Sequence, residues 1–150
     1  MSVTLATGQV VDTLTKVGLK ETQIVLTDTA APGNTFALVH TPVAATQATV
    51  SQAAGAANVR NVCTGISASL CTVGTAQAAV VQANLRDGAT GAGTILWSQS
   101  FSFGTTTMVA VNITGLCIYG TAATAMTLEF SAAGVAASFE SVALTGFTTA

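Results

Sequence analysis

Apolar and polar residues alternate along most of this chain, and this alternation limits the possible folds more than any other feature of the sequence. Successive side chains of a strand point to opposite faces, so a period of two predicts a strand with one face on a core. The pattern recurs from about Ala48 onward. It predicts six strands, in the segments RNVCTGISASLCT, AVVQANLR, TILWSQSFSF, MVAVNI, AMTLEF and FESVALTGF.

In each segment the alternation places a set of mostly apolar residues on one face. Polar or small residues occupy the opposite face, as Cys63, Ser67, Ser69 and Cys71 do in the first segment. The shared faces are Val62, Ile66, Ala68 and Leu70; Val81, Ala83 and Leu85; Ile95, Trp97, Gln99, Phe101 and Phe103; Val109, Val111 and Ile113; Met126, Leu128 and Phe130; and Val142 with Leu144.

Two further strands are predicted upstream, around Ile24–Leu26 and Phe36–Val39, which gives about eight in total. Turn residues separate the strands at APGN (31–34), RDGATGAG (86–93), NITG (112–115) and SAAG (131–134). The glycine-rich RDGATGAG is expected to join two antiparallel neighbours as a hairpin loop. SQAAGAANVR resembles a short helix, but Gly55 in its middle disfavours one, so strand or loop is expected.

Short alternating strands with frequent turns predict an all-β, two-sheet sandwich of jelly-roll or related Greek-key type. At 150 residues the chain is long enough for one such domain. Residues 21–150 are assigned to the sandwich. Residues 1–20 have a weaker apolar pattern and two of the four basic residues, so they form either an N-terminal arm, which would dock on another molecule, or an edge strand.

The scarcity of charge excludes some partners. Only 7% of residues are charged, and Lys16, Lys20, Arg60 and Arg86 are the only basic ones, too few to neutralise a run of phosphates. We therefore expect no nucleic-acid partner. No membrane partner is expected either, because no run approaches the ~20 apolar residues of a spanning helix. So little charge protects poorly against self-association, which predicts a surface that contacts neighbours.

The three cysteines favour a reducing compartment. Cys63, Cys71 and Cys117 are an odd number without CxxC spacing, as is typical of small core residues that remain free thiols. A Cys63–Cys71 disulfide across a turn is the alternative. The N-terminus lacks the basic start and apolar stretch of a signal peptide, so synthesis in a cytoplasm is expected.

No residue pattern indicates catalysis. His40 is the only histidine, and neither a nucleophile elbow nor a cysteine in catalytic context accompanies it, so a structural histidine is favoured over a general base. Glu129 and Glu140 are expected to be outward and solvated. The ligand clusters that metals need are missing from the sequence, and no cofactor is expected. We predict a protein that is not an enzyme, with no catalytic, cofactor-binding or metal-binding residue.

Aromatic residues are the remaining candidates for ligand contact. Trp97, Tyr119, Phe36 and Phe147 are the realistic stacking platforms. Trp97 is in phase with Phe101, which favours core packing. Tyr119 lies between glycines, which favours the surface.

The segments HTPVAATQATVSQAAGAANVRNVCTGISASL, NLRDGATGAGTILWS and GTAATAMTLEFSAAGVAASFESVALTGF resemble a family of small phage and prophage virion structural proteins. The motifs of the resemblance are Asn61–Ile66, Arg86–Trp97 and Ala125–Phe130, and it covers His40 to about Phe147. It implies a virion component, with a sandwich like those that decorate phage heads or build tail appendages, and transfers no binding residue.

Together these observations predict a capsid decoration or cement protein. Its partners would be the major capsid protein and copies of itself, as a homo-oligomer of two or three chains, in a virion assembled in a bacterial cytoplasm. A tail or fibre module that binds a receptor or carbohydrate is the alternative.

Overall fold

The protein is described by a computed structural model that covers residues 2–4, 10–12 and 34–150. The chain divides into two units, Met1–Ala31 and Pro32–Ala150. In the first, β1 (Ser2–Thr4) pairs with β2 (Val10–Asp12) in antiparallel register. The strand expected at Ile24–Leu26 and the boundary expected at residue 20 lie outside the described residues, so the choice between an arm and an edge strand stays open.

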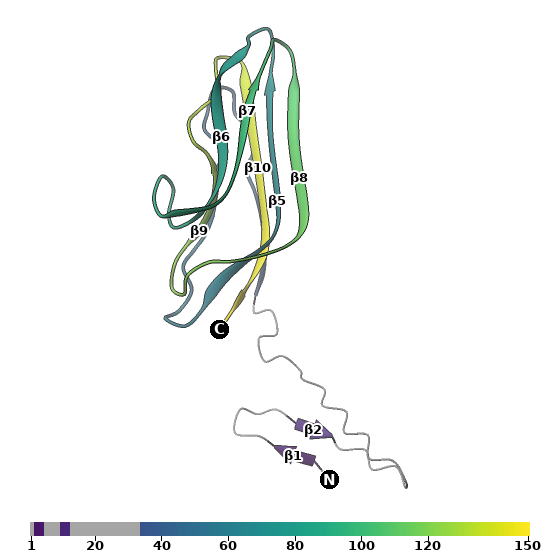
Figure 1. Cartoon of the computed structure of the whole chain (residues 1–150), viewed down its shortest axis with the longest axis vertical. Helices are drawn as coiled ribbons and strands as arrows, with labels where there is room; N and C mark the ends of the chain where they lie inside the picture. Colours follow the sequence, from purple (N-terminus) through teal and green to yellow (C-terminus); the bar gives the residue numbers. More distant parts are fainter. Residues whose placement is uncertain (1, 5–9, 13–33) are drawn as a thin grey trace. The chain divides into compact units, whose positions relative to one another are not determined.

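The second unit is a sandwich of two antiparallel four-stranded sheets (Figure 1). We name each sheet after one of its inner strands. The β5 sheet has the order β3-β10-β5-β8, with β3 at Thr35–Val39, β10 at Ser138–Thr149, β5 at Arg60–Thr72 and β8 at Met108–Tyr119. The β6 sheet has the order β4-β9-β6-β7, with β4 at Thr49–Gln52, β9 at Met126–Phe130, β6 at Gln77–Asp87 and β7 at Thr94–Phe103.

The connections follow jelly-roll topology, which confirms the predicted fold class. From β3 onward, every link between consecutive strands passes from one sheet to the other, except the β6–β7 hairpin, which stays within the β6 sheet. This arrangement, two interleaved Greek keys, lets each sheet bury its inner face against the other.

The core lies between the two sheets and consists largely of the residues that the alternation selected. Phe101 and Phe130 lie at its centre, with ring centroids 5.3 Å apart and a tilt of 51°. The fully buried members that were predicted are Ile66, Ala68, Leu70, Val81, Ala83, Leu85, Phe101, Met126, Leu128, Phe130, Val142 and Leu144.

Two of the predicted faces are wrong where a strand has a β-bulge, because the extra residue reverses which side chains face inward. The register of β5 against β10 shifts between Cys63 and Gly65, so Cys63 joins the central core cluster, whereas Val62 is fully buried but lies outside that cluster. On β7, Leu96 is the extra residue opposite Leu85 and Arg86. Ile95 is consequently 47% exposed, whereas Trp97 still packs against the core.

The turn predicted at Asn112–Gly115 is also wrong, since β8 runs through it from Met108 to Tyr119. Gly115 adopts a φ of 72°, and the register of β8 against β5 shifts beside it. Gly115, which was interpreted as a turn residue, therefore lies in a β-bulge. The loop predicted at RDGATGAG is confirmed, because it joins antiparallel β6 and β7.

The alternative of a Cys63–Cys71 disulfide is excluded by the fold. Both residues belong to the single strand β5, eight positions apart, so their Cα atoms are separated by roughly 26 Å at the usual rise of a strand. A disulfide needs less than about 7 Å. All three cysteines are free thiols.

Within the described residues, no helix is long and apolar enough to cross a bilayer.

Replacing Leu85 by Ala should lower the free energy of unfolding by about 2–5 kcal/mol, because it leaves a cavity in the core. Val80 lies on the same strand but is exposed, and its replacement by Ala should cost less than about 0.5 kcal/mol. Equilibrium urea denaturation of the two variants measures both values. Equal losses would contradict the assignment of the inner face of β6.

Candidate interaction surface

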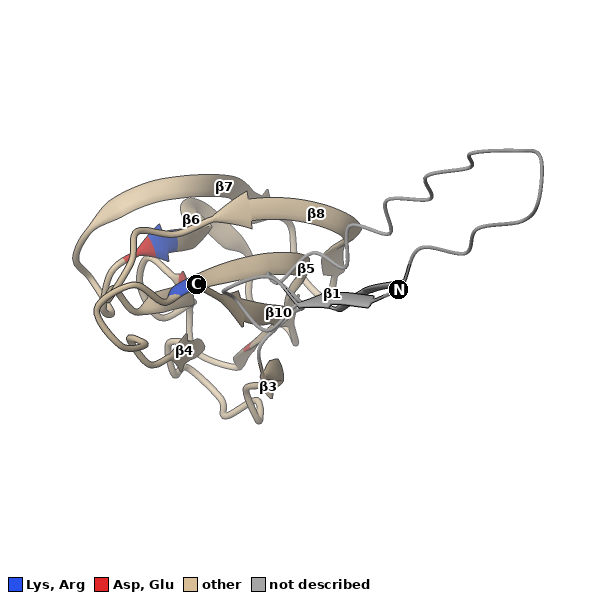
Figure 2. Cartoon of the chain, turned by 90° about the horizontal axis from the view of Figure 1, so that it is seen from below, with Lys and Arg blue, Asp and Glu red and all other residues tan. Residues whose placement is uncertain are grey.

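The sandwich exposes few charged side chains fully to water. Residues 34–150 include five charged residues, and of these only Arg60 is classed as exposed. Arg86 and Asp87 are half-buried, while Glu129 and Glu140 are buried. Figure 2 shows the charged positions as a few patches on an otherwise uncharged ribbon. The outside of this unit is therefore polar but nearly without charge.

Glu129, predicted to be solvated, is 1% exposed, and that prediction is wrong. Its carboxylate forms an ion pair with Arg86, with Nε and Oε1 2.5 Å apart. It also accepts hydrogen bonds from the Gly91 backbone N–H at 3.0 and 3.1 Å. Gly91 belongs to the β6–β7 loop, so this loop folds back over the outer face of its own sheet.

Further contacts hold the β6–β7 loop in place. The Thr127 hydroxyl donates to the carbonyl of Gly88, whose own N–H donates to the carbonyl of Ala125. At the base of the loop, Asp87 accepts from the backbone and hydroxyl of Thr121. A Cβ at Gly93 would lie 2.1 Å from the Asp87 carbonyl oxygen, so only glycine fits there. The loop covers part of the outer face of the β6 sheet and makes that part unavailable to a partner.

Glu140 is the second acid that was predicted to be outward and solvated, and for this residue both parts of the prediction are wrong. It is fully buried, on the face of β10 that also presents Val142 and Leu144 to the core. Oε2 accepts a hydrogen bond of 2.9 Å from the Ala48 N–H, and Oε1 has no partner of hydrogen-bonding geometry among the residues that the structure describes. Burial raises the pKa of Glu140 to about 7, against the opposing effect of the backbone amides of Ala48 and Gly134.

The outer face of the β5 sheet, unlike that of the β6 sheet, is not crossed by any loop of residues 34–150. Strand register aligns Phe139, Cys71 and Met108 in one row, and Ser141, Ser69 and Ala110 in the next. A third row consists of Val39, Ala143, Ser67 and Asn112. Val39 and Met108 are 72% and 68% exposed, and Phe139 is 39% exposed. Small residues make the middle of this face shallow, and its rows contain no charged residue.

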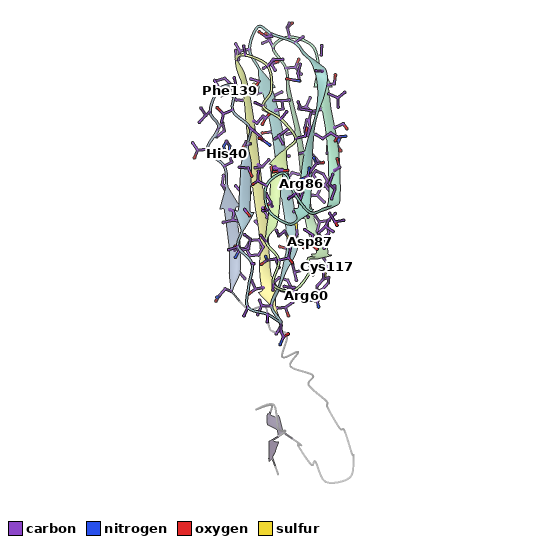
Figure 3. The ribbon with its side chains drawn as sticks, turned by 90° about the vertical axis from the view of Figure 1, so that its left-hand side faces the viewer. His40, Arg60, Arg86, Asp87, Cys117 and Phe139 are labelled. Carbon is purple, nitrogen blue, oxygen red and sulfur yellow. The ribbon has the colours of Figure 1, made fainter. Side chains whose placement is uncertain are left out.

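Among residues 34–150, no acid is hydrogen-bonded to His40. His40 follows β3, and its backbone N–H donates to the Val142 carbonyl. Its Nδ1 is buried and has no hydrogen-bond partner in the described part of the chain. Figure 3 shows that Arg60, Asp87 and Cys117 lie nearer the end of the sandwich where the chain terminates than Phe139 does. Within the described residues no three His, Cys, Asp or Glu side chains gather as metal ligands.

The aromatic candidates are divided between the core and the surface. Trp97 and Phe36 pack against the core, as predicted for Trp97. Tyr119 is 52% exposed at the end of β8, as predicted.

The thiols are divided in the same way. Cys63 is a core residue, and burial raises its pKa to about 11, so the thiol is unreactive near neutral pH. Cys117 is exposed, contrary to its predicted core position, because it lies beside the bulge in an edge strand.

Sequence reasoning did not identify the outer face of the β5 sheet as a surface for contact. The signal was present, because Ser67, Ser69 and Cys71 alternate with the core residues and are uncharged. Phe139 and Met108 complete this face from the strands on either side of β5. The identity of those neighbouring strands depends on the topology, which the local sequence does not encode.

No protein-family model and no curated protein matches the chain. Among solved structures, a chain from Bacillus endospore appendages, described as a novel family of disulfide-linked pili, is 14% identical to this protein. The match covers 78% of this chain and 87% of that one, with a TM-score of 0.30. Similarity of this extent bears on neither function nor partners, and the resemblance to phage virion proteins stays a prediction.

The raised pKa of Glu140 predicts that the protein loses stability as the pH rises. Below about 4.5 the acid is protonated in both states, and between about 4.5 and 7 only the unfolded state releases the proton. Over that interval the folded state holds more protons, so the free energy of unfolding should fall by about 3 kcal/mol. Urea denaturation at several pH values measures this slope.

Glu140→Gln should remove the slope, because glutamine has no proton to release. Glu129→Gln is the matched control, since it alters an equally buried glutamate that is paired with Arg86. The control should lose stability but keep the slope between pH 4.5 and 7. If the slope remains in Glu140→Gln, the pH dependence of stability does not come from Glu140.

Proposed function

We propose that this protein is a structural subunit that assembles with copies of itself through the outer face of the β5 sheet. The observation that carries the proposal is the near absence of exposed charge on residues 34–150, where Arg60 alone is classed as exposed. An isolated soluble domain has roughly a quarter to a third of its surface in charged residues. A surface of the kind seen here is suited to permanent contact.

The composition of the outer face supports a copy of the same chain as its partner. Phe139 and Met108 are residue types that are enriched at the centres of interfaces, where charged residues are depleted. A charged partner would lose hydration on this face without gaining an ion pair, whereas a second copy brings no charge to desolvate. Ser69 and Ala110 in the middle of the face would allow two sheets to approach closely.

Within this class we propose a phage capsid decoration or cement protein, which binds the major capsid protein as well as its own copies. The resemblance of residues from His40 to about Phe147 to virion structural proteins supports this role, as does the size of a single sandwich. The protein would be made in the host bacterial cytoplasm and then become part of the virion. It would act by contact alone, without catalysis, a cofactor, nucleic acid or a membrane.

A tail or fibre module that binds a receptor or carbohydrate is the second candidate, and the exposure of Tyr119 favours it. Sugar recognition through stacking usually relies on exposed aromatic faces, and Trp97 and Phe36 are committed to the core. The uncharged outer face of the β5 sheet is the larger feature, so we favour decoration.

Replacing Ser69 by Arg should abolish self-association, because it places an unpaired charge in the middle of the outer face. The matched control is Ser100→Arg, which adds the same charge at an exposed position on β7 in the other sheet. Light scattering coupled to size-exclusion chromatography should show oligomers for the wild type and the control, and monomers for Ser69→Arg. Circular dichroism checks that both variants fold. Identical oligomers of all three proteins, or a monomeric wild type, would contradict the proposed face.

Quantitative mass spectrometry of purified virions tests the decoration role separately. Hundreds of copies per particle, released with the head and not with the tail, are expected. A few copies that purify with tails would favour the second candidate, and absence from virions would overturn both phage roles while leaving the self-assembly result intact.

A further inference from the structure

The apolar core contains one polar corner, formed by Glu140, Ser138, Thr72 and Gln77. Each of the four is at most 2% exposed. Ser138 and Glu140 are two positions apart on β10 and therefore share its inner face. Thr72 is the register partner of Ser138 on β5, and Cβ atoms of such partners lie about 4.5–5.5 Å apart. The four side chains thus meet at one end of the core.

Gly134, in the loop between β9 and β10, closes this corner. A Cβ at Gly134 would lie 2.4 Å from Ser138 Oγ and 3.2 Å from Gln77 Oε1. Any larger residue would therefore collide with the polar groups. The backbone of this loop also borders the corner. The Val135 N–H donates a hydrogen bond of 3.0 Å to Gln77 Oε1.

The hydrogen bonds of the corner are incomplete within the protein. Gln77 uses both ends of its amide, and Glu140 Oε2 accepts from Ala48. Glu140 Oε1, Ser138 Oγ and Thr72 Oγ1 have no protein partner among the described residues. Burying a polar atom without a partner costs about 1–3 kcal/mol, so three such atoms in one corner require a common explanation.

No described cation faces Glu140. In the described part of the chain the one ion pair joins Arg86 to Glu129, which lies on the outer face of the β6 sheet. On β5, Cys71 points outward, Arg60 lies at the opposite end of the strand, and Cys63 lies in the core at the bulge. β3 and β4 contain no titratable residue, and His40, after β3, contacts β10 through its backbone. An ionised Glu140 would be a buried charge with only the backbone amides of Ala48 and Gly134 to offset it and no opposite charge among the described residues, which is unfavourable.

We propose that the polar corner binds one ordered water molecule, held between Glu140 Oε1 and the hydroxyls of Ser138 and Thr72, with Glu140 in its protonated form. A protonated carboxyl adds one donor to the corner, and the two hydroxyls can each donate or accept. Buried water typically makes about three hydrogen bonds to polar groups of this kind. The direction of the Glu140 pKa agrees with this state.

A double-mutant cycle tests the shared water. Ser138→Ala should raise the unfolding equilibrium constant in the wild-type background, and should raise it several-fold less in the background of Glu140→Leu, where the water has already lost its acidic partner. Ser141→Ala, two positions along β10 from Phe139 on the outer face, is the matched control and should have the same effect in both backgrounds. Equal effects of Ser138→Ala in the two backgrounds would overturn the proposal that a water molecule connects Ser138 with Glu140.

Infrared spectroscopy of the unmodified protein provides a second readout that no folding defect can obscure. At pH 6 the wild type should show the carbonyl stretch of a protonated carboxylic acid, which shifts in heavy water and disappears in Glu140→Gln. Glu129→Gln should retain the band. A wild-type spectrum without it would mean that Glu140 is ionised and would overturn the proposal.

Discussion

The packing of two inner faces against each other is the constraint on which the rest of this structure depends. In this jelly roll nearly every connection passes to the opposite sheet, and only the β6–β7 hairpin remains in one. This exception has a role of its own. Its loop is free to fold back, and Glu129 fixes it through Gly91 and Arg86. The connection that stays within one sheet is thus the one whose loop covers an outer face.

Much of the fold could be predicted because a period of two is local. The apolar inner residues of β6, β9 and β10, such as Leu85, Leu128 and Leu144, were identified from alternation alone, because a period of two holds along the part of each strand that contains them. The errors occurred where the local rule does not apply. Gly115 permits a bulge as readily as a turn, and the extra residues near Cys63 and at Leu96 reverse the faces. Whether a bulge forms depends on how a strand pairs with its neighbour. The sequence of one strand does not reveal this pairing.

The positions of the two glutamates were less predictable, for a different physical reason. An acid that alternates with core residues has an outward position, and Glu129 does lie on an outer face. It is buried because a distant loop covers it. Glu140 precedes Val142 and Leu144 in the inward phase, so the pattern did contain its position, but the usual cost of burying an acid favoured the opposite interpretation. One glutamate fixes a loop to the outside of the sandwich, while the other lies within it.

The near absence of exposed charge also has a kinetic consequence. Residues 34–150 contribute little long-range field, so these sandwich units would not guide one another, and encounters between their outer faces would proceed at the unsteered rate, on the order of 10⁵–10⁶ M⁻¹ s⁻¹. Dissolved salt would change that rate little, because residues 34–150 offer few exposed charges for ions to screen. The rate at which the assembly grows would then depend on the local concentration of subunits on a common scaffold.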